Sequence, residues 1–375
     1  MKKITLFGAA CLLLGACGTT GQTKISLSNP SAFERKAEVV ELPWSAVLKK
    51  YPAMDTTQLK VTDAGSGKEL LYQIEYKGEK SPVNLLVQVD IPASGTTTIA
   101  LDKGKPAATT PLTYGRYVPE RLDDFAWEND RIAFRMYGKA LETTPKDNAY
   151  GVDVWSKRTP ALIINKWYKT GDYHKDNGEG LDYYKVGRTL GGGDIAPYTA
   201  DSIWFPLNYR TWKVLDNGPL RTTFELGYEP WNVNGRIVKA VKRISLDAGS
   251  SLNKAVVTYE TSDKNPLDVI TGITKRPEPG GNTVTDAAIG LTAYEEPAHG
   301  EDGVIFLATL AAKKAETTEF KQHLATKMQV ESGKPLAYYF GAAWNKAGYF
   351  TSNEAWTNYV RNFYQRSQEP IQIKF

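Results

Sequence analysis

Short runs in which hydrophobic and polar residues alternate occur along most of the chain. Between Ile25 and Leu101 such runs recur roughly every ten residues, separated by turn sequences such as DAGSG (63–67). A period of two places alternate side chains on one buried face of a strand. The pattern therefore predicts an antiparallel β-sandwich over residues 31–105. Its clearest strands are AEVVELPW (37–44), ELLYQIEY (69–76) and VNLLVQVDIP (83–92).

A second region of alternating residues follows the linker-like stretch KGKPAATTPL (103–112). Its runs are long enough to build a large antiparallel sheet, and helices are few. The clearest helix is SNEAWTNYVRNFYQRS (352–367), with Ser352 as its N-cap. The fold class is therefore mainly β, with a larger domain over residues 112–375. The predicted strands there include VDVWSK (152–157), ALIINKWY (161–168), RIVKAVKRISLD (236–247), LNKAVVTYETS (252–262) and PIQIKF (370–375).

One alternating strand, RIAFRMY (131–137), carries charge on a single face. Arg131, Ala133 and Arg135 lie on that face, and the opposite face is apolar. The charged face either lines a cleft or is the solvated outer side of the sheet.

The chain begins MKKITLFGAACLLLGACGTT, with two lysines, an apolar run from Ile4 to Leu14, and then LGAC. This is typical of a bacterial signal peptide over residues 1–16 that ends in a lipobox. The apolar run is shorter than the roughly 20 residues of a membrane span. We therefore predict a lipoprotein, periplasmic or anchored to the outer membrane only through a lipidated Cys17, with residues 17–30 as a tether.

Both cysteines, Cys11 and Cys17, lie in or next to this leader. The body therefore has no disulfide, thiol nucleophile or thiolate metal site, which excludes cysteine hydrolases and zinc fingers. Without residues 1–16 there are 44 basic and 42 acidic residues, a balance that predicts no nucleic-acid partner. No phosphate loop or GxSxG sequence occurs. The 9 Trp and 21 Tyr favour stacking on sugar rings, although β-sandwich cores also bury aromatic residues.

The segment DYHKDNGEGLDYYKVGRTLGGGDIAPY (172–198) concentrates reactive side chains among glycines. Glycines end strands and helices and let the backbone approach a ligand closely, which favours a loop at a functional site. A solvated polar surface loop is the alternative. The candidate catalytic residues in it are His174, Glu179, Asp182, Tyr183 and Tyr184.

Three blocks of sequence resemble the DUF4861 family of secreted bacterial proteins, often from Bacteroidetes. They are ERLDDFAWENDRIAFRMYG (120–138), the segment 172–198 and YYFGAAWNKAGYFTSNEAWTNYV (338–360). The resemblance spans nearly the whole mature chain. It implies an association with the use of polysaccharides that contain uronic acids, and a β-supersandwich related to galactose-mutarotase-like proteins. It implies no particular catalytic residue.

Three kinds of glycan chemistry fit these residues. A lyase that acts on uronosyl residues needs a proton acceptor and donor, such as His174 with Tyr183 or Tyr184, and an arginine that neutralises the carboxylate. A glycoside hydrolase needs two carboxyl groups, such as Glu179 with Asp182, or Glu128 with Asp124. A glycan-binding or mutarotating protein is the third alternative. The expected substrate-binding residues are Arg121, Trp127, Glu128, Arg131, Arg188, His299 and Trp344.

A metal ion is a further alternative for the same loop. His174, Asp176, Glu179 and Asp182 offer imidazole and carboxylate ligands for a divalent cation such as Ca²⁺, but their spacing is not that of an EF-hand. No other cofactor is expected. Outside the loop, His299 in EEPAHGEDG is a better reserve candidate for the site than His323.

Overall fold

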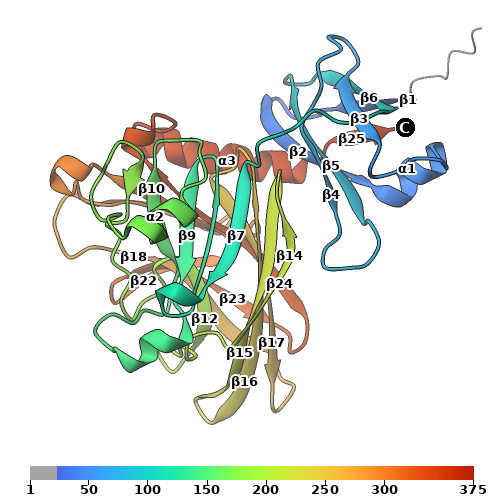
Figure 1. Ribbon diagram of the computed structural model, residues 1–375. Helices are drawn as coiled ribbons and strands as arrows, with labels where there is room; N and C mark the ends of the chain where they lie inside the picture. Colours follow the sequence, from blue (N-terminus) through green and yellow to red (C-terminus); the bar gives the residue numbers. More distant parts are fainter. Residues whose placement is uncertain (1–22) are drawn as a thin grey trace, which may run out of the picture.

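The computed structural model describes residues 23–375, which form a small and a large β domain (Figure 1). The small domain is a sandwich of a four-stranded sheet, ordered β25-β1-β6-β3, and a three-stranded sheet, ordered β2-β5-β4. The helix α1 (Trp44–Lys50) packs beside β2 and β5. The strands are β1 (Thr23–Ser28), β2 (Arg35–Pro43), β3 (Leu59–Asp63), β4 (Tyr72–Glu75), β5 (Asn84–Ile91), β6 (Thr96–Lys103) and β25 (Gln372–Lys374).

The boundaries of the small domain differ from the prediction at both ends of the chain. Strand β1 lies within the predicted tether and pairs with β6 along its whole length. Strand β25 is the last strand of the chain, yet it belongs to the small domain. It pairs antiparallel with β1, so that Leu27 lies opposite Ile373. Ile371, Ile373 and Phe375 pack against the core of the sandwich. The predicted signal peptide and Cys17 lie outside the described residues.

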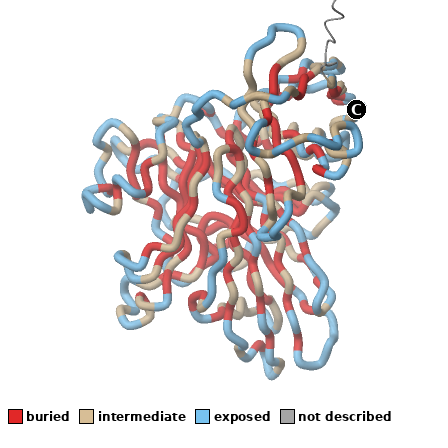
Figure 2. Tube along the Cα trace, turned by 45° about the vertical axis from the view of Figure 1, so that its right-hand side comes forward, coloured by how far each residue is buried: buried red, intermediate tan, exposed pale blue. Residues whose placement is uncertain are grey.

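The large domain is a β-supersandwich, as predicted. One eight-stranded antiparallel sheet, ordered β14-β15-β16-β17-β24-β21-β20-β19, faces two five-stranded sheets, ordered β11-β10-β9-β8-β7 and β13-β12-β18-β23-β22. The buried segments concentrate where these sheets face each other (Figure 2). Aromatic side chains dominate this core, for example where Phe125 stacks on Phe224 with 4.1 Å between the ring centroids.

The strands of the large domain begin at the end of the predicted linker. They are β7 (Thr113–Val118), β8 (Asp124–Asn129), β9 (Ile132–Met136), β10 (Asp153–Lys157), β11 (Gly180–Leu181), β12 (Gly192–Thr199), β13 (Ser202–Ile203), β14 (Thr211–Asn217), β15 (Arg221–Val233), β16 (Arg236–Asp247), β17 (Leu252–Thr261), β18 (Leu267–Thr274), β19 (Asn282–Asp286), β20 (Leu291–Glu295), β21 (Ile305–Leu310), β22 (Glu316–Phe320), β23 (His323–Val330) and β24 (Pro335–Trp344).

Two helices cover the outer faces of the large domain. Helix α3 (Asn353–Gln368) packs Trp356 and Val360 against β20 and β21, and the Ser352 hydroxyl accepts a hydrogen bond from the Ala355 amide at 3.2 Å, so the predicted N-cap is confirmed. Helix α2 (Ile164–Thr170) covers the sheet that contains β8. The prediction of a strand at this position was wrong. Short 3₁₀ helices occur at η1 (Pro119–Arg121), η2 (Lys139–Thr143), η3 (Gly300–Asp302) and η4 (Asn345–Ala347).

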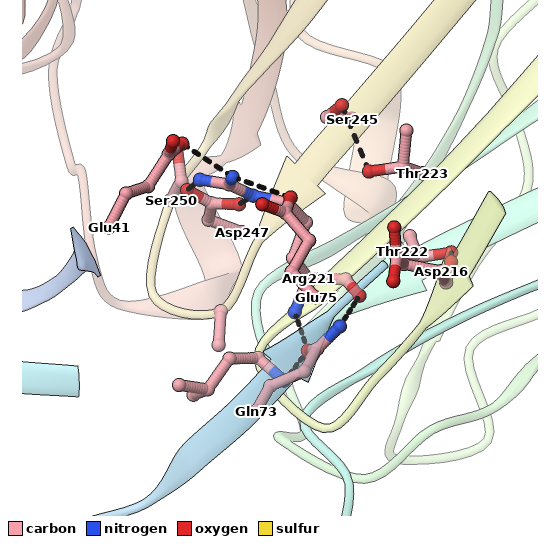
Figure 3. A network of polar contacts seen from close by, with 12 residues as sticks. Glu41, Gln73, Glu75, Asp216, Arg221, Thr222, Thr223, Ser245, Asp247 and Ser250 are labelled. Atoms are coloured by element: carbon pink, nitrogen blue, oxygen red, sulfur yellow. Dashed lines mark hydrogen bonds and ion pairs between the residues drawn. The ribbon is translucent and has the colours of Figure 1, made fainter. Parts of the chain in front are cut away.

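The two domains are joined by a network of polar contacts around Arg221 (Figure 3). The Arg221 guanidinium bonds Asp247 of its own domain, at 2.5 Å from Nε, and reaches Glu41 and Glu75 of the small domain at 2.6 Å and 3.0 Å. The Gln73 side-chain oxygen accepts the Arg221 backbone amide at 2.7 Å. These contacts hold the small domain against the end of the large sheet. None of the helices between residues 23 and 375 combines the length and apolar composition that a membrane span needs.

Candidate functional site

The glycine-rich segment lies against the outer side of the β7–β11 sheet and does not enclose a site around His174. The His174 side chain is 65% exposed, and its Nδ1 is 2.9 Å from the Asp182 carbonyl oxygen. The Glu179 carboxylate bonds Lys166 at 2.9 Å, and this hydrogen bond is the main reason that its pKa is lowered. A carboxyl with a lowered pKa is a poor general acid near neutral pH.

Two glycines of this segment are needed for close packing of backbone on backbone, and not for approach to a ligand. Gly180 has φ +123° and Gly191 has φ +59°, conformations that side chains disfavour. A Cβ atom at Gly180 would lie 2.0 Å from the Ser156 carbonyl oxygen, and one at Gly191 would lie 2.2 Å from that of Val152. The glycines therefore let the segment pass close to β10.

The later part of the segment does contribute to a cavity, of about 140 Å³, at the ends of several strands. Tyr183 follows β11, Arg276 follows β18, and Glu296 and His299 follow β20. All four side chains line the cavity, together with Lys185 and Glu278. The structure thus brings together two predicted residues that are far apart in the sequence, Tyr183 and His299. Beside them lie Arg276 and Glu296, which were not predicted.

Glu296 is the most perturbed carboxyl of this cavity. Its side chain is 5% exposed and forms an ion pair with Arg276. Burial raises the pKa of Glu296 from 4.5 to about 7, against the opposing effects of Arg276 and His299. The nearby Glu278 carboxylate raises this pKa further. Glu296 can therefore exchange a proton near neutral pH.

His299 is oriented by a carboxylate and by an aromatic ring. Its Nδ1 lies 2.9 Å from the Asp302 carboxylate, and its ring stacks on Tyr183 with 5.0 Å between the centroids. A histidine that is held at Nδ1 by a carboxylate presents Nε2 as a proton acceptor. Trp344 supports this arrangement, because its indole N–H donates to the Asp302 carbonyl at 2.7 Å.

Arginine and tyrosine side chains complete the wall of the cavity. The Arg276 guanidinium lies over the Tyr184 ring at 4.3 Å and donates to the Lys185 carbonyl at 2.6 Å. Burial raises the pKa of both Tyr183 and Tyr184. Tyr183 lines the cavity and can donate a hydrogen bond there, whereas Tyr184 is 4% exposed and does not reach it, so its prediction as a catalytic residue was wrong. The cavity therefore combines a proton acceptor, proton donors and a guanidinium.

Three residues predicted to bind substrate are inaccessible. Trp344 is 1% exposed, so the prediction that it contacts a sugar was wrong. The Trp127 side chain is 0% exposed in the core, where its indole N–H donates to Asn253 at 2.8 Å. Glu128 is 0% exposed and bonds the buried Lys157 at 2.6 Å, and it accepts the Ile163 and Ile164 amides at the start of α2. The prediction that Trp127 and Glu128 contact a sugar was wrong, because both are enclosed.

Asp182 belongs to a buried cluster around Arg135 on the outer face of the β7–β11 sheet. The Arg135 guanidinium lies 2.6 Å from Asp153, 3.4 Å from Asp182 and 3.7 Å from Asp124. Burial raises the pKa of Asp182 and raises that of Asp124 to about 6. Helix α2 and Tyr173 pack over this face. The charged face of β9 is therefore enclosed, and neither lines a cleft nor faces solvent.

The other predicted arginines lie apart from the residues that line the cavity. Arg121 bonds the Tyr173 hydroxyl at 3.3 Å, and Arg188 lies over the Tyr150 ring at 5.3 Å. Arg131 stands on the turn between β8 and β9 and lies over Tyr349. His323 is buried and accepts the Leu190 amide at 3.2 Å, and burial lowers its pKa to about 4. His323 is therefore structural.

The predicted metal ligands do not converge. Asp176 accepts the Gly178 and Gly180 amides and pairs with Arg158 at 2.5 Å. Within the part of the chain that the structure describes, no three His, Cys, Asp or Glu side chains are arranged to hold a metal ion. The loop over residues 172–182 is thus not a cation site.

Arg276 and Glu296 are the site residues that sequence reasoning missed. Glu296 lies three residues before His299 in EEPAHGEDG, so the reserve candidate His299 was a usable signal. Arg276 in TKRPEPGG has no comparable signal, because only the packing of the sheet that contains β18 against the sheet that contains β20 brings it to the cavity.

Comparison with known proteins identifies one family and several similar chains. The model of a domain of unknown function, DUF4861, matches residues 27–373. The uncharacterized protein P7 of Formosa agariphila is 30% identical over 293 residues, which are 73% of each chain. An α-mannosidase from Enterococcus faecalis V583 and a glycosyl hydrolase family 38 protein from the same species align with 94% of this chain, at 10% identity and TM-scores of 0.40 and 0.45. The alignments cover 45% and 47% of those two chains.

Proposed function

Since this chain belongs to the DUF4861 family, whose description assigns no activity, we propose its function from the cavity: a lyase that acts on uronic-acid-containing glycans. The observation that carries the proposal is one wall in which His299, held by Asp302, stacks on Tyr183 beside Arg276 and Glu296. The uronic acid follows from the family resemblance and from the cationic side chains around the cavity, Arg276 and Lys185.

Each step of such an elimination has a residue to perform it. His299 Nε2 accepts the proton from the sugar carbon next to the carboxylate, and Arg276 and Lys185 offset the negative charge that develops there. The bond between the neighbouring carbon and the glycosidic oxygen breaks, and a carbon–carbon double bond forms. Tyr183, whose phenol is protonated near neutral pH, donates a proton to the departing oxygen, which leaves as a hydroxyl group. Glu296 positions the Arg276 guanidinium through their ion pair.

A glycoside hydrolase is the second candidate, and one observation favours it. Glu278 lines the same cavity as Glu296 and raises the pKa of that buried carboxyl. A buried carboxyl with a raised pKa beside a second carboxyl is suited to a general acid with a nucleophile or base. In that mechanism Glu296 protonates the leaving oxygen, and Tyr183 takes no part in proton transfer.

We also propose that the protein reaches its substrate from a membrane surface, through a lipid on Cys17. This rests on the leader sequence alone. A surface lipoprotein meets soluble glycan fragments without being released from the cell.

Incubation of the purified protein with a panel of uronic-acid glycans tests the proposal. A lyase increases ultraviolet absorbance from the new double bond together with reducing ends, whereas a hydrolase increases reducing ends only. Tyr183→Phe should lower lyase turnover by roughly 10²–10⁴-fold, and Tyr114→Phe, outside the site, serves as the matched control. Neither signal with any glycan of the panel would contradict both enzymatic mechanisms.

A further inference from the structure

A larger groove lies between the two domains, apart from the residues of the cavity described above. Its volume is about 580 Å³, against about 140 Å³ for the cavity. Ligand sites usually have about 300–1,000 Å³, so the groove has room for several sugar units. Its walls are the segment 33–39 of the small domain, the turns after β8 and β16, and helix α3, which crosses toward β2 (Figure 1).

Arg131 is the one arginine of this groove without an acidic partner among residues 23–375. Its guanidinium lies over the Tyr349 ring at 4.7 Å and makes no ion pair within 4.0 Å. Arg366, in contrast, pairs with Glu38 at 3.5 Å. The turn that carries Arg131 is fixed, because the neighbouring Asp130 accepts the Gly249 amide at 2.7 Å. A positioned guanidinium without a carboxylate is suited to bind one from a ligand.

The rest of the lining has the chemistry that sugar rings require. Tyr349 and Phe33 are 47% and 39% exposed, unusually open for aromatic side chains in a groove. Aromatic faces of this kind stack on the apolar faces of sugars. Asn358 and Asn362 lie one turn apart on α3, line the groove, and form no side-chain hydrogen bond with the described residues. Their amides are free to bind hydroxyl groups.

The groove is close to the cavity along the chain. Trp344 contacts Asp302, which holds the histidine of the cavity, and Tyr349 lines the groove. The five peptide units from Trp344 to Tyr349 span at most about 18 Å when fully extended. One glycan chain can therefore reach both places.

We propose that this groove is a second binding site, which holds a carboxylate-bearing segment of the glycan through Arg131 and Tyr349. The choice of a uronic-acid ligand rests on the proposed function, whereas the binding itself does not require catalysis. The guanidinium binds a sugar carboxylate, the tyrosine stacks on a sugar ring, and the asparagine amides bind hydroxyls. The segment in the groove keeps the chain near the cavity between reaction cycles.

Isothermal titration calorimetry of the full chain tests this site with hexamers of galacturonate, guluronate and mannuronate, and with their carboxyl-reduced forms. We expect at least one acidic hexamer to bind. Arg131→Gln should weaken its affinity by roughly 10-fold or more, the usual effect of a lost charge-assisted hydrogen bond. Arg131→Lys should weaken the affinity less than Arg131→Gln does. Tyr349→Ala should weaken it about as much as Arg131→Gln. Affinity for the reduced hexamers should not depend on Arg131.

The matched control is Arg236→Gln, on the hairpin between β15 and β16, where Arg236 pairs with Asp263 at 2.8 Å. Unfolding temperatures of all variants identify any loss that comes from misfolding. If no acidic hexamer binds, or if Arg131→Gln and Tyr349→Ala bind as the wild type does, the groove is not a glycan site. Turnover is measured on the same samples. If binding depends on Arg131 and Tyr349 but no glycan is cleaved, only the proposed enzymatic function is contradicted. If a glycan is cleaved but binding does not depend on Arg131 and Tyr349, only this second binding site is contradicted.

Discussion

Replacing Glu296 by glutamine should change how the stability of the large domain depends on pH. Burial raises the pKa of Glu296 from 4.5 to about 7, so the folded protein keeps this proton in a range where the unfolded chain has lost it. Wherever the folded state binds more protons, the free energy of unfolding falls as pH rises. The wild type therefore loses stability between about pH 4.5 and about pH 8, while a neutral glutamine contributes no such loss.

The size of the effect follows from the two pKa values. At 1.36 kcal/mol for each pH unit, the difference between 4.5 and about 7 corresponds to about 3 kcal/mol. The side chain is 5% exposed, so solvent screening reduces this value little. The pKa of about 7 already includes the opposing effect of Arg276, so the ion pair needs no separate correction. The predicted quantity is the difference in the free energy of unfolding between Glu296→Gln and the wild type. Between about pH 4.5 and about pH 8 this difference should shift by about 3 kcal/mol in favour of the variant, or roughly 6–12 °C in Tm.

Thermal unfolding followed by tryptophan fluorescence is the assay. All nine tryptophans except Trp44 lie in the large domain, so the signal reports chiefly on the domain that holds Glu296. Glu295→Gln, one residue earlier on the more open side of β20, is the matched control and should follow the wild type. A difference between Glu296→Gln and the wild type that stays constant from about pH 4.5 to about pH 8 would refute the raised pKa.

Three further changes test other parts of the account. Glu128→Ala leaves the buried Lys157 ammonium without its carboxylate partner and should cost about 3–5 kcal/mol of stability in urea unfolding, so a loss below about 1 kcal/mol would show that the pair is not buried in solution. Cys17→Ala should remove acyl groups in intact-mass analysis and release the protein from membranes, and an unacylated native Cys17 would contradict the lipoprotein prediction. Arg221→Ala should loosen the small domain and speed proteolysis of the linker over residues 104–112, and unchanged cleavage would show that other contacts hold the domains.

Most strands were predictable because their side chains alternate with a period of two and turn residues separate them. Helix α2 was not, since ALIINKWY is apolar and rich in isoleucine, which locally favours a strand. The Glu128 carboxylate overrides this preference by accepting the first amides of the helix at 2.9 Å and 2.8 Å. Strand β25 was predictable as a strand, but its partner β1 lies at the other end of the chain.

The candidate site was predictable only in part. Tyr183 and His299 carry visible signals, because reactive side chains stand among glycines or acidic residues. Arg276 and Glu296 join them because the sheets that contain β18 and β20 pack against each other, which no local pattern reveals. The same limit explains the errors over Trp127 and Glu128, because the sequence does not show that the facing sheet encloses Trp127 or that helix α2 begins over Glu128. His174 shares its segment with Tyr183 yet lies outside the cavity, because Gly180 turns the chain between them.

The central claim is that proton transfer takes place at His299 in the cavity and not at His174 in the glycine-rich loop. The most direct test is the turnover of His299→Ala and His174→Ala on the uronic-acid glycan that the wild type cleaves fastest, with unfolding temperatures measured alongside. Both side chains are more than half exposed, at 57% and 65%, so neither change should unfold the protein. We predict that His299→Ala lowers turnover by roughly 10²–10⁴-fold and that His174→Ala stays within a few-fold of the wild type. The opposite order, or full activity of His299→Ala, would contradict the assignment of the site.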